Sequence, residues 1–179
     1  QIMHAQAKAG GSTLKERLAR IQENFKSAET FDRAWSRNSG DIKGILACED
    51  VRVYIRDAKR PEVTAKVTVL GQDKELRYPL SPTSLTGFTA LTQKLIRLDD
   101  VHNDQLLAKL HPQVRYNRNY DSITGVTTKS IISVPLVFEK TMYGVFQAVN
   151  YKGGLPFSDQ HVQIVKLLVR IMAEKIADE

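Results

Sequence analysis

Apolar residues near the start of the chain recur every three or four positions, which is typical of a helix with one buried side. The first such stripe consists of Leu14, Leu18, Ile21 and Phe25. It predicts a helix that begins after the capping residue Ser12 and ends near residue 28. A second helix is expected over about 30–47, although the pair Ser39–Gly40 weakens the pattern at its middle.

The pattern then changes to a period of two, which indicates strands. Three of them are expected over 50–57, 63–70 and 74–80, joined by short turns as an antiparallel meander. In the first strand Val51, Val53 and Ile55 alternate with charged residues. Two further strands are expected over 130–138 and 142–150.

Short helices and one long loop are expected between the two groups of strands. Residues 84–94 and 103–110 predict short helices on either side of the apolar segment 95–98. Residues 113–128 are polar and aromatic without periodicity, so they predict a loop of a length that is often functional. A last helix is expected from Ser158, as its N-cap, to about residue 177.

This order of elements predicts an α+β fold in which helices flank a five-stranded antiparallel sheet. The length of 179 residues suits one domain, which we place at 12–179 with the terminal helices included. The small and polar residues 1–11 are expected to be a disordered or tag-like terminus.

Composition and charge exclude several classes of function. The net charge of +6 is mild, and no long basic run indicates DNA binding. No apolar run approaches the roughly 18 residues of a membrane span. The single cysteine, Cys48, has no partner for a disulfide, and the spacing of the four histidines fits no metal site. We therefore expect a cytoplasmic, non-enzymatic protein without DNA binding or membrane insertion.

The second half of the chain resembles a GAF domain, a small-molecule-binding and signalling module found beside effector domains. The stretches that carry this resemblance are SLTGFTALTQKLIRLDDVH (84–102), TGVTTKSIISVPLVF (124–138), YGVFQAVNYKGG (143–154) and PFSDQHVQIVKLL (156–168). The resemblance implies a GAF-like, also called profilin-like, sheet flanked by helices.

The segment KLHPQVRYNRNYDSITGVTTKS (109–130) resembles the long loop of GAF domains at the N-terminus of type II secretion and type IV pilus assembly ATPases. That resemblance implies such an ATPase as the attached effector. The chain itself has no G-x-x-x-x-G-K-[ST] motif for nucleotide hydrolysis.

In GAF domains the region of this loop closes over a ligand pocket, and the ligand here would be nucleotide-like or another small molecule. A purely structural loop and a nucleic-acid contact are the alternatives. No cofactor follows from the residues. The expected ligand-binding residues are Phe88, Leu98, Asp100, Tyr116, Tyr120, Thr124, Thr127, Ser130 and Gln147. For Asp100, next to Asp99, the alternative is a structural role in orienting the following helix.

One family signature is incomplete. Asn150–Tyr151–Lys152 with Phe157 resembles part of the cyclic-nucleotide signature of GAF domains. His161 and Val162 stand where that signature has an acidic pair, which argues against a cyclic-nucleotide site.

The last helix has two apolar stripes. One has heptad spacing and consists of Val162, Val165, Val169, Met172 and Ile176. Its mate is the stripe of Leu14, Leu18, Ile21 and Phe25, either within one chain or across a homodimer, since GAF domains commonly pair through such helices. The sequence thus predicts a sensor domain that relays ligand binding through its terminal helices, with a ligand-free dimerisation or docking module as the alternative.

Overall fold

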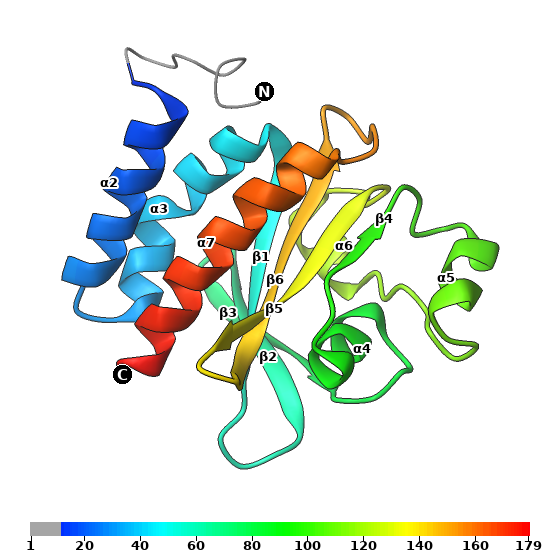
Figure 1. The fold of residues 1–179 in the computed structure, drawn as a ribbon. Coiled ribbons are helices and arrows are strands. Elements are labelled where there is room, and N and C mark those ends of the chain that lie inside the picture. Colours follow the sequence, from blue (N-terminus) through cyan, green and yellow to red (C-terminus); the bar gives the residue numbers. More distant parts are fainter. Residues whose placement is uncertain (1–11) are drawn as a thin grey trace.

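The computed structural model describes residues 12–179, so the predicted disordered or tag-like terminus at 1–11 lies outside the described residues. One antiparallel sheet forms the centre of the molecule, with helices on both of its faces (Figure 1). The strands are β1 (Cys48–Arg56), β2 (Glu62–Val69), β3 (Gln72–Pro79), β4 (Ile96–Leu98), β5 (Ile131–Phe138) and β6 (Thr141–Tyr151). Their order in the sheet is β3-β2-β1-β6-β5-β4. The predicted α+β class is confirmed.

The prediction of five strands was wrong, because the sheet has six. The additional strand is β4, which pairs antiparallel with β5 and sets Ile96 opposite Ser133. Three residues are too few for an alternation of polar and apolar positions to be visible in the sequence.

The helices are α2 (Leu14–Ser27), α3 (Phe31–Leu46), α4 (Leu85–Thr92), α5 (Asp104–Leu110), α6 (Asn119–Thr124) and α7 (Asp159–Ala177). Two expectations need correction. Thr13, not Ser12, caps α2, since its side chain accepts a hydrogen bond from the N–H of Glu16. The segment predicted as a loop without regular structure contains α6, which ends at Gly125 with a φ of 79°.

The helices α2, α3 and α7 cover one face of the sheet, which we call the helix face (Figure 1). Alternate residues of β5 and β6 point into this layer and form one continuous apolar core with the helices. At its centre Phe146 is fully buried, and its ring lies 6.2 Å from that of Trp35 on α3.

The two apolar stripes expected at a dimer interface, one on the first helix and one on the last, lie in this same core. Leu14, Leu18, Ile21, Phe25, Val165, Val169 and Met172 are buried within the single chain, and Val162 and Ile176 are partly buried against them. The structure therefore shows the alternative arrangement, in which the stripes pack within one chain, because α2 and α7 lie side by side on the sheet. The homodimer itself stays a prediction.

The opposite face of the sheet carries α4, α5 and the segment 113–128. We call this segment, which contains α6, the lid. Two smaller apolar clusters lie here instead of one continuous core. The hairpin of β2 and β3 diverges from β1, since β1 pairs with β2 only at Ile55 and Arg56. A cleft of about 480 Å³ opens where the strands separate, and both Trp35 of α3, from the helix face, and Tyr120 of the lid line it.

Candidate functional site

Polar side chains form a row across the lid face of the sheet. Arg52 on β1 is the register neighbour of Gln147 on β6, which in turn neighbours Ser133 on β5. All three residues are at most 1% exposed. Because polar groups are costly to bury without partners, each of them needs hydrogen bonds from the elements that cover this face.

Arg52 connects the sheet to the lid. Its Nε donates to Asp50 Oδ2 at 2.9 Å, and its Nη2 donates to Asp121 Oδ1 at 2.8 Å. Its Nη1 donates to the Tyr116 hydroxyl at 3.0 Å, and the Tyr120 ring lies 4.2 Å from the guanidinium carbon. Burial opposes the charged form of Arg52, but the surrounding tyrosines and the two carboxylates outweigh it and raise its pKa. The guanidinium is therefore permanently charged, and each of its three nitrogens has a hydrogen-bond partner.

Asp121 is held as firmly as Arg52. Its Oδ1 accepts from Arg52 and, at 2.7 Å, from the Thr128 hydroxyl, while its Oδ2 accepts from the Thr128 N–H at 2.9 Å. The Tyr116 hydroxyl lies 2.9 Å from the same Oδ1. Burial opposes ionisation, but the hydrogen bonds from Thr128 and Arg52 hold the pKa of Asp121 below its usual value. The lid is thus fastened to the sheet by a buried ion pair.

Gln147 belongs to a second, uncharged group of polar side chains. Its Nε2 donates to Thr86 Oγ1 at 3.0 Å and to Ser133 Oγ at 3.1 Å. The Ser133 hydroxyl also lies 2.8 Å from Thr89 Oγ1. These contacts join α4 to the middle of the sheet, so the space beside Gln147 is occupied by the protein's own side chains.

An open pocket of about 540 Å³ lies beside the lid and reaches the ion pair. The residues that line it are His102, Arg118, Asp121, Ser122, Gly125 and Thr127. His102 Nε2 lies 2.8 Å from the Thr128 carbonyl oxygen, and its Nδ1 lies 3.2 Å from Arg118 Nη2. A molecule in this pocket would meet the histidine, the arginine and the edge of the buried carboxylate.

Some of the predicted ligand-binding residues come together around this pocket and ion pair. Tyr116 and Tyr120 contact Arg52, and Thr127 lines the pocket. Thr124 is exposed at the end of α6, where its Oγ1 donates to the Tyr120 carbonyl.

The other predicted residues lie elsewhere. Phe88 and Leu98 belong to the apolar cluster beneath α4 and α5. Asp100 accepts from the N–H of His102 and orders the turn before α5, which is its structural alternative. Ser130 is buried and donates to the Leu155 carbonyl. The predicted set therefore does not converge on one empty space between sheet and lid.

Arg52, Asp121, Thr128 and His102 were not predicted. In the sequence Arg52 is a charged position between Val51 and Val53, and a period of two alone does not tell which side of a strand is covered. Its burial follows from the place of β1 inside the sheet, beneath the lid.

The positions of the incomplete signature have structural roles. The Asn150 side chain accepts from the N–H groups of Lys129 and Ser130 and donates to the Thr127 carbonyl, which clamps the end of the lid. His161 completes a capping box with Ser158 at the start of α7. Burial lowers the pKa of His161, so it stays neutral there.

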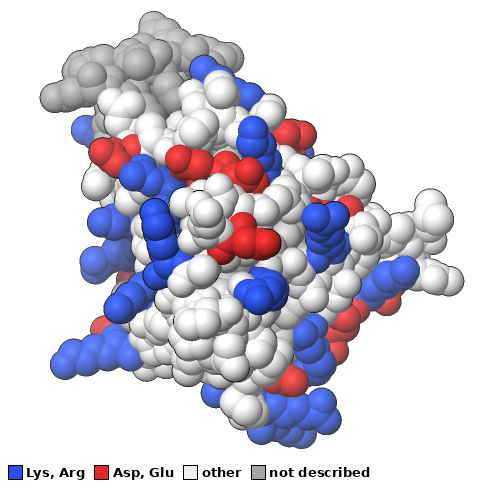
Figure 2. All heavy atoms as spheres, turned by 90° about the vertical axis from the view of Figure 1, so that its right-hand side faces the viewer, with Lys and Arg blue, Asp and Glu red and all other residues white. Residues whose placement is uncertain are grey.

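The described residues offer little to other kinds of chemistry. Within 12–179 no group of three or more His, Cys, Asp or Glu side chains is placed to hold a metal ion. Burial raises the pKa of the Cys48 thiol to about 12, which makes it a poor nucleophile. No helix in this part of the chain is long and apolar enough to cross a membrane. Figure 2, viewed from the side of α4 and α5, shows basic side chains at separate places among acidic and uncharged ones.

Comparisons with known proteins agree on one family. The family model described as GAF domain matches residues 40–176, more than half of the chain. Two curated relatives are similar. "Probable 3',5'-cyclic phosphodiesterase pde-5" of Caenorhabditis elegans is 25% identical, and the match covers 62% of this chain and 16% of the relative. The cone cGMP-specific 3',5'-cyclic phosphodiesterase subunit alpha' of Bos taurus is 24% identical, and the match covers 89% of this chain and 20% of the relative. The chain thus spans about a fifth or less of these relatives.

A solved structure shows the same fold. The GAF domain from a phosphoenolpyruvate-protein phosphotransferase of Coxiella burnetii superposes with a TM-score of 0.70 at 16% identity, and the match covers 92% of each chain.

Proposed function

Because this chain belongs to the GAF domain family, we propose that residues 12–179 form a non-catalytic sensor domain that binds a small molecule at the lid. Binding shifts the lid, and the terminal helices relay the change to an attached effector. The observation that carries this proposal is the buried pair of Arg52 and Asp121, which joins a polar, mostly exposed lid to the centre of the sheet beside an open pocket.

The path of the relay follows from the position of β1. Arg52 lies on the lid side of this strand, and Val51, on its other side, packs into the core shared by α2, α3 and α7. Only Ala47 separates the end of α3 from the start of β1. A ligand that favours one position of the lid therefore biases the packing of the terminal helices, provided that it binds the two arrangements with different affinities.

The effector and the ligand are finer parts of the proposal. The resemblance of the segment 109–130 supports a type II secretion or type IV pilus assembly ATPase as the effector. Two relatives carry cyclic phosphodiesterase in their names, but in this chain His161 caps a helix and Val162 is apolar, so we do not extend cyclic-nucleotide binding to it.

A thermal-shift screen with nucleotides, cyclic dinucleotides and metabolites tests the sensor. A ligand at a concentration of 100 times its Kd stabilises the fold by about 2.7 kcal/mol, which is a readily measured rise in Tm. We expect Arg118→Ala, in the pocket, to abolish the shift. Arg37→Ala, an exposed change on α3, is the matched control and keeps it. A compound whose shift survives Arg118→Ala binds elsewhere and contradicts the site.

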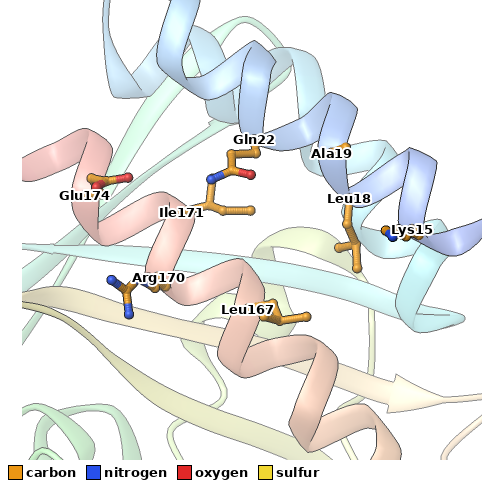
Figure 3. Close-up of a pocket in the computed structure, with 8 residues that line it drawn as sticks. All are labelled: Lys15, Leu18, Ala19, Gln22, Leu167, Arg170, Ile171 and Glu174. Atoms are coloured by element: carbon orange, nitrogen blue, oxygen red, sulfur yellow. The ribbon is translucent and has the colours of Figure 1, made fainter. Parts of the chain in front are cut away.

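The second candidate is a ligand-free dimerisation or docking module. It is favoured by the filled space around Gln147 and by a shallow groove between α2 and α7, lined in part by Leu18, Leu167 and Ile171 (Figure 3). Leu167 on α7 and Leu91 on α4 are both 48% exposed. If α7 pairs two chains, Leu167→Glu gives a monomer in light scattering and Leu91→Glu leaves the dimer intact. A monomeric parent chain contradicts this candidate.

A further inference from the structure

The carboxylate of Asp121 occupies a set of hydrogen-bond donors in the manner of a bound ligand. Arg52, Tyr116 and Thr128, which we call the cradle, place a guanidinium N–H, a hydroxyl, a second hydroxyl and a backbone N–H within 2.9 Å of its two oxygens. Charge-assisted bonds of this kind are the strongest available for a carboxylate.

The cradle is held in place by contacts that do not involve Asp121. Arg52 is also bound by Asp50, and its residue is 1% exposed. Thr128 is fully buried, and its carbonyl oxygen lies 2.8 Å from His102 Nε2. The cradle would therefore keep its shape if the Asp121 carboxylate left it.

The segment that carries Asp121 has few anchors of its own. The helix α6 has six residues, none of them fully buried, and its N-cap residue Arg118 makes no capping hydrogen bond, although the Asn117 side chain accepts from the N–H of Asn119. A helix this short is not stable by itself. It ends at Gly125, whose left-handed φ of 79° allows a sharp change of chain direction. Apart from Asp121, its main anchor is Tyr120, whose ring packs against Tyr54.

The open pocket supplies a route to the cradle. Asp121 itself lies in the wall of this pocket, together with His102 and Arg118. A carboxylate that enters from solvent passes these two hydrogen-bonding side chains and reaches the position of Asp121. Exchanging one carboxylate for another leaves Arg52 paired, so no buried charge is uncovered.

We propose that the cradle of Arg52, Tyr116 and Thr128 is the binding site for the carboxylate group of a small organic acid, and that Asp121 is the internal carboxylate which this ligand displaces. Displacement releases α6, which gives the lid two arrangements. This inference rests on the proposed sensor function and specifies the chemical class of its ligand.

The variant Asp121→Ala empties the cradle and is the direct test. Its Tm is compared in sodium formate, sodium acetate, sodium phosphate and sodium chloride at matched ionic strength. We expect a lower Tm than that of the parent chain in chloride, and a saturable recovery in formate or acetate but not in phosphate or chloride. In the parent chain Asp121 competes, so half-saturation needs a concentration that is higher by about tenfold or more.

Two variants serve as controls. Asp121→Asn leaves a neutral and therefore weaker occupant in the cradle, so its half-saturating formate concentration should lie between those of Asp121→Ala and the parent chain. Asp159→Ala removes an exposed carboxylate that pairs with Arg97 at 2.8 Å, away from the cradle, and should respond to formate no more than the parent chain does. A folded Asp121→Ala protein without a formate-specific shift, or an equal shift in Asp159→Ala, overturns the inference.

If Asp121→Ala does not fold in any of these salts, hydrogen exchange of the parent chain decides. Formate should accelerate the exchange of the amides of residues 122–125 relative to chloride, and unchanged exchange overturns the inference. If the carboxylate test fails while the screen yields another compound that depends on Arg118, the sensor stands and only the ligand class is wrong.

Discussion

The two faces of the sheet are built in different ways. On the helix face, α2, α3 and α7 bury one continuous apolar core. On the lid face, two small apolar clusters are separated by the polar row of Arg52, Gln147 and Ser133, and the helices have between six and eight residues. The stabilisation from apolar burial grows with the buried area and does not depend on the direction of each contact. A buried polar row, in contrast, depends on the exact placement of each hydrogen-bond partner. The first face therefore suits a scaffold and the second a site that can switch.

Truncation of the central aromatic side chain should give the largest difference between the faces. Phe146→Ala empties the middle of the helix-face core and is expected to lower the free energy of unfolding by about 3–5 kcal/mol. Phe88→Ala makes the same change on the lid face at a partly exposed position, so we expect about 1–2 kcal/mol. Urea denaturation measures both, and equal losses would break the distinction.

Removal of the buried cation should be the next largest effect. Arg52→Met leaves Asp121 and Asp50 without their charge partner and is expected to cost about 3 kcal/mol. Arg97→Met breaks a pair whose carboxylate, on Asp159, is 91% exposed, so it should cost less than about 1 kcal/mol. Urea denaturation at neutral pH compares them, and a similar cost for both would show that the lid pair is not structural.

The sequence was sufficient for the helix face, because its elements are long and periodic. The stripe of α2 and the heptad spacing of α7 identified the residues that form the core, but left open whether they pack within one chain or between two. Only the geometry of the sheet, which places both helices on the same face, distinguishes these cases. The short elements β4 and α6 carry too few residues for a period to be recognised.

Gln147→Leu tests the uncharged half of the polar row. The change leaves the Thr86 hydroxyl without its amide partner, while Ser133 keeps its contact with Thr89, so we expect a loss of about 1–2 kcal/mol. Gln105→Leu, at an exposed position on α5, is the control and should fall within about 0.5 kcal/mol of the parent chain. Thermal unfolding followed by circular dichroism measures both, and a stabilising effect at Gln147 would mean that the row is not satisfied as described.

The smallest expected effect is a difference in the pH dependence of the two faces. Burial lowers the pKa of His161 on the helix face, so its contribution to stability is complete above the unfolded value of about 6.5 and is lost as the pH falls below it. The pKa of Asp121 on the lid face is also lowered, so its contribution is lost only as the pH falls below about 3.9. His161→Gln should flatten the decline of Tm between about pH 7 and pH 5. A decline that persists in this variant assigns the effect to another group.

The site was less accessible from the sequence than the fold. Tyr116 and Tyr120 were found because aromatic residues in a polar loop are conspicuous, but their partner Arg52 lies on a strand whose alternation hid it. The pairing of Arg52 with Asp121 joins positions 69 residues apart, and no local pattern specifies such a contact. It follows from the register of β1 and from the path of the lid across the sheet.

The central claim is that the lid opens as a unit of its own and is fastened by Arg52 and Asp121. Hydrogen exchange of the parent chain and of Arg52→Met, resolved along the sequence, tests this most directly. We predict that residues 113–128 exchange through an opening that costs less than global unfolding, and that Arg52→Met accelerates them more than it accelerates β5 and β6. If the lid and these strands exchange with the same free energy of opening, and Arg52→Met lowers it equally in both, the result contradicts the account.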